Sequence, residues 1–373
     1  MIVVMKKILF LIHDLGAGGA EKVLVNLVNH LNRQKYDITV GVLFGGGVNE
    51  QFLNESIHFF SVWSKMIPGN SKLMKLLTPE QLHKLCVREH YDIEISYLEG
   101  PTARIVSGCQ DEETKLVSWI HVGQHTMKNL AQSFRNEHEA MMCYNRFDQT
   151  ICVSESVKDD FCSILDFQRS CKVLYNTVES EVIKQLAVEP TDAFSDDNRI
   201  RLIAVGTLKQ SKGYDRLINI IEKLDKENYP VHLYILGTGP LCQEMVASIK
   251  ERKLEHCITL LGYHTNPYKF VAKCDLFVCA SHTEGFSTAA TEALIVGTPV
   301  CTVDVSGMQE MLGKNNEYGV VTGNSEAALY EGIKQMIDSE KMMAYYNEKA
   351  KERGQAFSTE ATVKAVEEML EGL

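Results

Sequence analysis

The chain alternates short apolar runs with segments in which apolar residues recur at helical spacing. Apolar runs of about four to eight residues are typical of buried strands. Strands that alternate with helices predict an α/β fold with parallel sheets. The runs expected to be strands are Ile8–Ile12, Ile38–Phe44, Ile93–Leu98, Leu116–Ile120, one that begins at Thr150, Lys172–Tyr175, Arg201–Val205, Val231–Leu236, Ile258–Leu261, Leu276–Ala280 and Val300–Val303.

The periodicity fails between residues 185 and 200, where proline, serine and acidic residues gather. That composition marks a linker. A length of 373 residues also suits two domains of ordinary size. We therefore expect one domain at 1–185, a second at 186–355 and a terminal helix at 356–373. The apolar face of this helix is formed by Val363, Val366, Met369 and Leu370.

The segment from Ser281 to Val300, SHTEGFSTAATEALIVGTPV, follows a predicted strand and contains a small-residue turn. Ser287 is a good N-cap for the helix that follows. A helix N-terminus offers free N–H groups and a positive dipole end to an anion. Glu284 and Glu292 flank this point, and carboxylates accept hydrogen bonds from hydroxyls. Together these features suggest a nucleotide-sugar site, although two solvated glutamates beside an ordinary α/β loop would give the same pattern.

Composition excludes several function classes. The net charge of −11 argues against a general nucleic-acid binder. The eleven cysteines form no C-x-x-C pair, which favours reduced thiols and no metal site. The first apolar run ends at His13-Asp14, too early for a signal peptide or a spanning helix. We therefore expect a cytoplasmic protein, at most on the inner face of the cell membrane.

The pair Glu284-x7-Glu292, within EGFSTAATEALIVGTPV, resembles the signature of the retaining GT-B glycosyltransferases of family GT4. The resemblance implies a GT-B fold, with two Rossmann-like domains that face a central cleft. The first domain would bind the acceptor, the second the nucleotide-sugar, and the terminal helix would cross back to the first. In this family the first Glu contacts the donor sugar and the second holds the ribose hydroxyls. The diphosphate would meet the backbone of Gly285, Phe286, Ser287, Thr288 and Ala289.

A lysine in the first turn of the second domain can neutralise a diphosphate leaving group. Family members show Gly-Arg-Leu followed by Lys-Gly, and this chain keeps Lys212-Gly213. Thr207 stands where the family has Arg, so one of two expected cations is missing. Lys209 could substitute, but it cannot repeat a bidentate grip.

Two positions in the first half also match the family. LGAGGAEKVLVNL, with Gly18 and Gly19, resembles the N-terminal loop near acceptor and donor phosphates. Glu21 is interpreted as a first-turn carboxylate that complements the helix dipole. His121 matches a family histidine beside the donor sugar, with His125 as the alternative, and the resemblance makes His121 a catalytic candidate with Glu284 and Lys212.

Further family positions lie in the second half. Tyr263 and His264 occupy the place where family members meet the nucleobase through backbone atoms, although simple loop residues would look the same. Gly307 and Glu310 resemble a Gly-x-x-Glu motif that supports the donor loop.

Residues 65–88 form a basic and apolar segment in an acidic protein. Between positions 60 and 90, five Lys or Arg stand against two Glu. Such a segment can contact anionic lipid. A solvated helix face packed by its leucines is the alternative.

The resemblance implies transfer of a hexosyl unit, with retention, from a nucleotide-diphosphate sugar. A UDP-sugar is the expected donor. The expected acceptor is a glycan or a polyprenyl-diphosphate-linked saccharide of envelope or capsular polysaccharide synthesis. No Asp-x-Asp occurs, so we expect no metal and no other cofactor. A UDP-sugar epimerase and a non-catalytic GT-B partner subunit stay open, whereas an NAD-dependent oxidoreductase would need the missing G-x-G-x-x-G.

Overall fold

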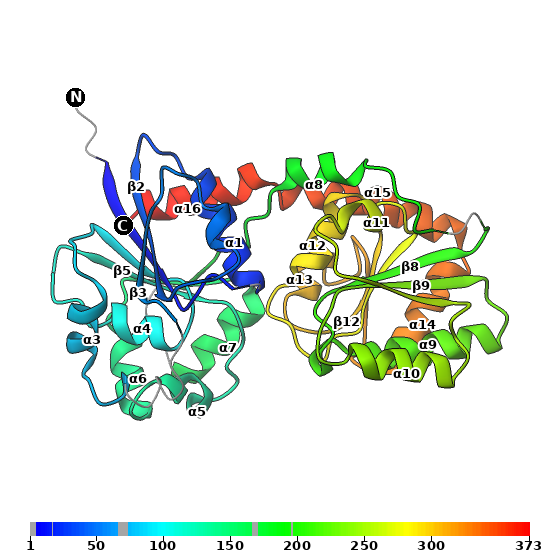
Figure 1. Cartoon of the computed structure of the whole chain (residues 1–373), viewed down its shortest axis with the longest axis horizontal. Coiled ribbons are helices and arrows are strands. Elements are labelled where there is room, and N and C mark those ends of the chain that lie inside the picture. Colours follow the sequence, from blue (N-terminus) through cyan, green and yellow to red (C-terminus); the bar gives the residue numbers. More distant parts are fainter. Residues whose placement is uncertain (1–4, 17, 66–73, 166–170, 195–196) are drawn as a thin grey trace. The chain divides into compact units, whose positions relative to one another are not determined.

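The computed structural model describes residues 5–16, 18–65, 74–165, 171–194 and 197–373. The chain forms two compact units, one of residues 1–178 with 359–373 and one of residues 179–358. Each unit is a parallel sheet with helices on both faces, which is the α/β architecture that the sequence predicts (Figure 1).

In its described residues, the first unit has a seven-stranded sheet of order β3-β2-β1-β4-β5-β6-β7. Helices α1 and α16 lie side by side on one face, and α4 packs on the other face against β1 and β4. The strands are β1 (Lys6–Ile12), β2 (Tyr36–Phe44), β3 (His58–Trp63), β4 (Ile93–Ser96), β5 (Lys115–Ile120), β6 (Gln149–Cys152) and β7 (Cys171–Val173). The helical segments are α1 (Gly19–His30), η1 (Glu50–Phe52), α3 (Pro79–Cys86), α4 (Pro101–Val106), α5 (Met127–Leu130), η2 (Ala131–Ser133), α6 (Glu137–Tyr144), α7 (Glu155–Leu165) and α16 (Thr359–Glu371).

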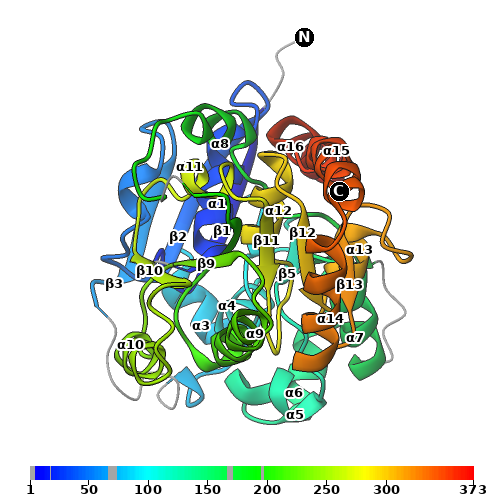
Figure 2. The same ribbon diagram turned by 90° about the vertical axis from the view of Figure 1, so that its right-hand side faces the viewer.

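The described part of the second unit has a six-stranded sheet of order β10-β9-β8-β11-β12-β13. Helices α9, α10 and α14 lie on one face, and α11, α12 and α15 lie on the other (Figure 2). The strands are β8 (Ile200–Val205), β9 (Val231–Leu236), β10 (Ile258–Gly262), β11 (Leu276–Cys279), β12 (Val300–Val303) and β13 (Val320–Thr322). The helical segments are α8 (Ser180–Ala187), η3 (Gln210–Lys212), α9 (Tyr214–Lys226), α10 (Cys242–Glu251), α11 (Tyr268–Val271), α12 (Thr288–Ile295), α13 (Met308–Leu312), α14 (Glu326–Ile337) and α15 (Glu340–Ala356).

The sequence pattern located most strands but missed two at the sheet edges. The apolar runs at Val231–Leu236 and Val300–Val303 are strands with those bounds. The missed strand β3 is half exposed, so its run HFFSVW lacks the continuous apolar character of a central strand. The missed strand β13 has only three residues, too few for a periodic signal.

Helix α16 belongs to the first unit although it follows the second in sequence. The Lys6 ammonium donates to the Leu370 carbonyl at 3.0 Å, and the Glu367 carboxylate accepts from the Asn32 amide at 2.8 Å. Val366 and Leu370 are fully buried. The last helix therefore completes the core of the first unit.

Among the described residues, no helix combines the length and the apolar composition needed to cross a membrane.

Candidate active site

The predicted donor loop joins β11 to α12 in the second unit. Ser287 is the N-cap of α12, and its hydroxyl accepts from the Ala290 amide at 3.3 Å. The Thr291 hydroxyl donates back to the Ser287 carbonyl at 3.0 Å. By helix geometry, the amides of Thr288 and Ala289 in the first turn have no intrahelical acceptor. The positive end of α12 can therefore receive an anion at this loop.

Gly307 lies directly against the same loop. Its φ is +80°, and a Cβ there would come within 2.9 Å of the Gly285 carbonyl oxygen and 2.8 Å of the Phe286 ring. Only glycine fits this close approach without displacing the loop. Gly307 precedes α13, so that helix packs directly behind the donor loop.

Lys212 and Glu284 meet although 72 positions separate them. The Lys212 ammonium lies 2.5 Å from Glu284 Oε1, and the Ser281 hydroxyl donates to the same oxygen at 2.6 Å. The side chains of Lys212 and Glu284 are 24% and 11% exposed. A small cavity is lined by both of them together with Ser281 and Ser287. A cation, a carboxylate and a helix N-terminus thus converge on one point of the second unit.

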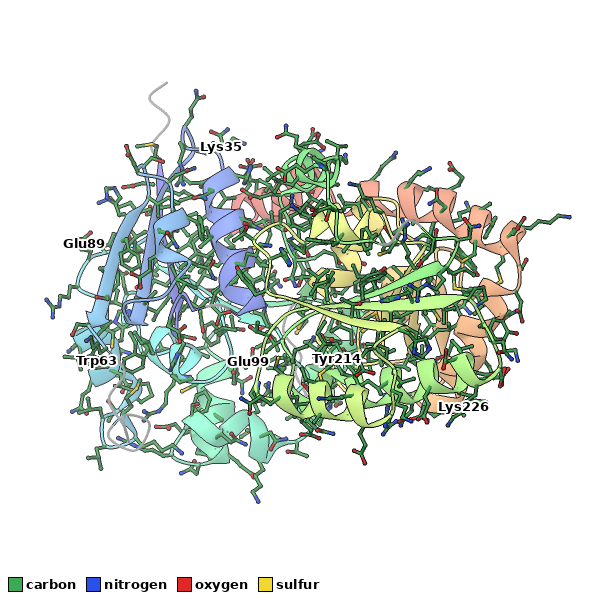
Figure 3. All side chains as sticks on the ribbon, turned by 45° about the vertical axis from the view of Figure 1, so that its right-hand side comes forward. Lys35, Trp63, Glu89, Glu99, Tyr214 and Lys226 are labelled. Carbon is green, nitrogen blue, oxygen red and sulfur yellow. The ribbon has the colours of Figure 1, made fainter. Side chains whose placement is uncertain are left out.

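Gly213 allows the Lys212 turn to sit against the strand that leads into the donor loop. Its φ is +65°, and a Cβ would lie 2.1 Å from the Ala280 carbonyl oxygen. Tyr214 follows as the first residue of α9 (Figure 3), and its hydroxyl donates to the Gly206 carbonyl at 3.0 Å. In the Lys-Gly pair, Lys212 thus supplies the charge that pairs with Glu284, and Gly213 leaves room for the Ala280 carbonyl.

Glu292 lies on α12, one residue beyond a buried threonine and half-buried itself. Its carboxylate accepts from the Tyr268 hydroxyl at 3.2 Å. Tyr268 is the first residue of the short helix α11, and it is buried. The Tyr268 contact orients the carboxylate that the family resemblance assigns to ribose.

The remaining predicted donor positions in the second unit are more exposed. Thr207 is exposed at the end of the β8 turn, and Lys209 is exposed as well. The Tyr263 side chain is 71% exposed, whereas the His264 ring lies 4.5 Å from the Phe270 ring. The loop at 263–264 therefore leaves Tyr263 available to a ligand.

In the first unit, His121 is buried at the end of β5. Its amide donates to the Glu99 carboxylate at 3.0 Å, and its ring lies 4.9 Å from that of Tyr97 (Figure 3 labels Glu99). Within the described residues, His121 Nε2 is buried without a hydrogen-bond partner. Burial lowers the pKa of His121 to about 3, so the ring is neutral at pH 7. A neutral imidazole can accept or donate one hydrogen bond but cannot act as a cation there.

His125, the alternative histidine, differs in every respect. It is exposed with a φ of +61°, and its Nδ1 lies 3.1 Å from Asp160 Oδ1.

Gly18 and Gly19 are exposed at the start of α1, where the Glu21 carboxylate turns back toward Gly18. Burial raises the pKa of Glu21. The roles proposed for His121, Gly18 and Gly19 stay predictions.

Sequence reasoning missed Glu99, Ser281 and Tyr268, which contact three of the predicted residues. Ser281 stands three positions before Glu284 and could have been noticed as a local partner. Glu99 and Tyr268 lie 22 and 24 positions from the residues they contact. No spacing rule covers those separations, because only the packed strands and helices bring them together.

Comparison with known proteins shows which family the chain matches. Residues 189–353 match the family model described as glycosyl transferases group 1, and residues 17–182 match that of glycosyltransferase family 4. A Campylobacter jejuni protein is 32% identical over 367 residues, which cover 95% of this chain and 96% of that protein. It is named N-acetylgalactosamine-N,N'-diacetylbacillosaminyl-diphospho-undecaprenol 4-alpha-N-acetylgalactosaminyltransferase.

Solved structures share the fold over nearly the whole chain. Anabaena HepE in complex with UDP has a TM-score of 0.76 at 20% identity, and the match covers 98% of this chain and 100% of that one. Sucrose-phosphate synthase from Thermosynechococcus elongatus has a TM-score of 0.77 at 16% identity, over 98% and 99% of the two chains. At these identities the two structures support the GT-B fold alone.

Proposed function

Because the chain belongs to the group 1 and family 4 glycosyltransferases and has their GT-B fold, we propose that it transfers a hexosyl unit, with retention, from a UDP-sugar to a hydroxyl of a polyprenyl-diphosphate-linked saccharide. The observation that carries the donor part is the convergence of Lys212, Glu284 and the α12 N-terminus. The acceptor part rests on the Campylobacter jejuni relative, whose name gives an undecaprenyl-diphosphate-linked saccharide.

In this proposal, different residues of the site bind the diphosphate and the hydroxyl groups of the donor. The α12 N-terminus and Lys212 would hold the diphosphate, Glu284 would accept from a sugar hydroxyl, and Glu292 would accept from ribose. Lys212 and Glu284 are already paired at 2.5 Å, so each is positioned before the donor arrives. Preorganised charge of this kind stabilises the transition state without reorganisation during the reaction.

In the proposed reaction the bond between the sugar C1 and the β-phosphate oxygen breaks, and the acceptor hydroxyl oxygen bonds to C1 on the same face. The acceptor proton passes to the departing phosphate. Lys212 and the helix N-terminus offset the charge that develops on that phosphate. We propose that no metal takes part in this step, which predicts equal turnover in chelator and in Mg²⁺.

Thermal unfolding with UDP, GDP, ADP and NAD tests the donor site. A ligand at 100 times its dissociation constant adds about 2.7 kcal/mol of stability. We expect UDP to raise the Tm of the wild type, and Glu292→Ala to lose that shift. Glu331→Ala, at an exposed position of α14, is the matched control and should keep it. Stabilisation by NAD and not by UDP would contradict the proposal.

Acceptor dependence separates a transferase from the epimerase alternative. UDP-N-acetylgalactosamine and a saccharide on undecaprenyl diphosphate are the first substrates to test, given the relative's name. The proposal expects UDP release only when both are present, and an α-linked product by NMR. Donor conversion without acceptor would favour an epimerase, and UDP binding without any turnover would favour a non-catalytic subunit.

We also propose that the basic segment 65–88 contacts anionic lipid, which would suit a lipid-linked acceptor. Residues 66–73 lie outside the described residues. Within the described part, Leu76 and Leu85 are 75% and 43% exposed, and Lys84 and Arg88 are exposed as well. In a flotation assay, the wild type should float with anionic vesicles. The double variant Lys84→Glu/Arg88→Glu should stay in the bottom fraction. Equal flotation of both would leave the segment as a solvated helix face.

A further inference from the structure

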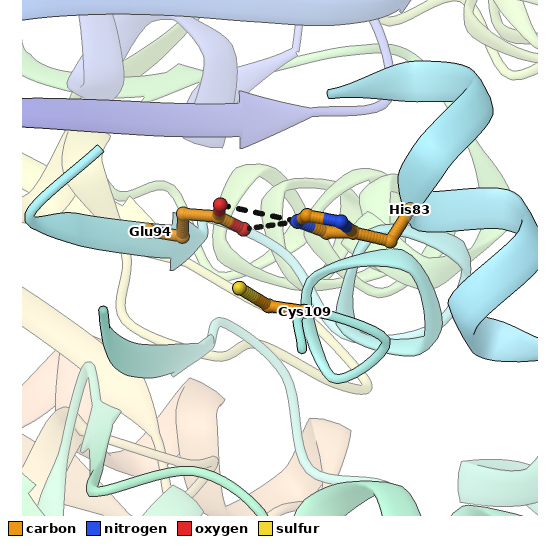
Figure 4. Close-up of side chains that lie close together, drawn as sticks. All are labelled: His83, Glu94 and Cys109. Atoms are coloured by element: carbon orange, nitrogen blue, oxygen red, sulfur yellow. Dashed lines mark hydrogen bonds and ion pairs between the residues drawn. The ribbon is translucent and has the colours of Figure 1, made fainter. Parts of the chain in front are cut away.

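Three side chains with metal-ligating atoms meet inside the first unit, on elements that the donor site does not use. Figure 4 shows His83 from α3, Glu94 from β4 and Cys109 from the turn after α4, all pointing toward one another. One ligand atom of each lies within 4.8 Å of the other two. His83 Nε2 is 2.8 Å from Glu94 Oε2 and 3.1 Å from Oε1.

The cluster lies in the protein core, unlike an acidic surface patch. Glu94 is 2% exposed on a central strand, where its Cα pairs with those of Leu9 on β1 and Leu116 on β5. Cys109 is also 2% exposed, and the His83 side chain is 14% exposed. A carboxylate buried among apolar strands is costly unless a cation or hydrogen bonds compensate it. The buried Glu94 carboxylate therefore suits a site that binds a cation, and a metal ion can be that cation.

The backbone is shaped to bring Cys109 to this point. A Cβ on Gly108 would lie 2.0 Å from the Pro79 carbonyl oxygen, so glycine lets the end of α4 touch the start of α3. Pro79 opens the helix that carries His83, and Thr78 fixes that end with a capping box to Gln81. The close contact between the end of α4 and the start of α3 therefore holds Cys109 and His83 near each other.

We propose that His83, Glu94 and Cys109 form a zinc site. Imidazole nitrogen, carboxylate oxygen and thiolate sulfur are the three ligand types that Zn²⁺ takes in proteins. A mixed nitrogen, oxygen and sulfur set disfavours Mg²⁺ and Ca²⁺, which prefer oxygen alone. Binding would displace the protons of His83 Nε2 and of the Cys109 thiol to buffer, and zinc would replace their charge beside Glu94. A water molecule can complete a four-coordinate shell from the side where His83 is exposed.

Metal binding by the whole purified protein tests the proposal. After treatment with a chelator, the protein is titrated with Zn²⁺ and, separately, with Co²⁺ as a spectroscopic probe. We expect one equivalent to bind, a rise in Tm, and a near-ultraviolet sulfur-to-cobalt absorption band. Cys109→Ser should abolish the band and weaken zinc binding by roughly 100-fold or more.

The chain offers a matched control. Asp225, His256 and Cys257 form a second group with ligand atoms within 4.8 Å, but the His256 side chain is 58% exposed. Cys257→Ser should leave the cobalt band and the zinc affinity unchanged. The proposal is overturned if Cys257→Ser removes the band, or if the wild type binds neither metal. The latter result would leave His83 and Glu94 as a buried ion pair. If the Cys109 variant fails to fold, the cobalt spectra of the wild type and of Cys257→Ser decide together.

Discussion

At the scale of single residues, two histidines of the first unit have pKa values shifted in opposite directions, because their rings face different neighbours. His121 Nε2 has no hydrogen-bond partner among the described residues, and burial lowers the pKa of His121 to about 3. Burial alone would also lower the pKa of His83, but hydrogen bonds to Cys109 and Glu94 raise it to about 9. The same residue type can therefore be a neutral group or a cation, depending on what faces its ring.

The neutral state of His121 predicts how stability depends on pH. Its folded pKa lies below the unfolded value of about 6.5, so its contribution is full above pH 6.5 and falls as the pH drops toward 3. Between pH 7 and pH 5 the wild type should lose about 2 kcal/mol that His121→Gln does not lose. Urea unfolding of both proteins at the two pH values measures the difference. His125→Gln, at the exposed histidine, should behave as the wild type does.

The pair between Lys212 and Glu284 predicts a selective loss of turnover. Lys212→Ala removes the cation expected at the leaving phosphate, and kcat should fall by roughly 100-fold or more. Lys226→Ala, which removes an exposed lysine paired on the surface of α9, should change kcat less than about twofold. Steady-state kinetics with the UDP-sugar donor measures both. Equal kcat for Lys212→Ala and wild type would remove Lys212 from the catalytic step.

At the scale of elements, glycines set how closely turns approach their neighbours. Gly213 separates η3 from α9 and touches the Ala280 carbonyl, and Gly307 touches the donor loop. These contacts fix where Lys212 and Phe286 lie, so the site depends on backbone packing as much as on its charged side chains.

Gly213→Ala should therefore damage both stability and donor binding. The variant combines a positive φ with a clash against backbone, and we expect a loss of at least about 2 kcal/mol in unfolding free energy. Gly323→Ala is the control, because a Cβ there meets only Ala328 Cβ at 3.6 Å. Chemical unfolding and UDP titration measure the two effects. A Gly213 variant with wild-type stability and UDP affinity would contradict this account of the turn.

At the scale of the whole molecule, the chain returns to its first unit at the end. Lys35, directly before β2, pairs with Glu371 at 2.6 Å, and the buried face of α16 covers the core of that unit. The first unit is thus built from both ends of the sequence, so its folding cannot be complete before the last residues are present.

Leu370→Ala tests this dependence. Leu370 is fully buried, and removing such a side chain costs about 2–5 kcal/mol. Hydrogen exchange should speed up in β1, β2 and β3, while β8 to β13 keep the protection of the wild type. Lys364→Ala, at an exposed position of the same helix, should change neither set. Faster exchange in both units would show that they unfold together.

The pattern of apolar runs predicted the α/β class, most strands and the helix at Ser287, because strand and helix periods are local properties of the chain. Motif spacing pointed to Glu284, Glu292 and Lys212, and the family resemblance to a GT-B glycosyltransferase. The half-exposed strand β3 and the short strand β13 escaped, since neither carries a continuous apolar run.

Contacts between residues far apart in the sequence could be found only from the tertiary structure. No ligand residues cluster along the sequence, which favours no metal site. Packing of α3, β4 and the turn after α4 brings His83, Glu94 and Cys109 together, and the proposed zinc site rests on that packing. The same holds for Glu99 beneath His121 and for Tyr268 on Glu292. The ionisation of His83 and His121 follows from these surroundings, because a pKa depends on burial and on neighbouring charges, which no local spacing encodes.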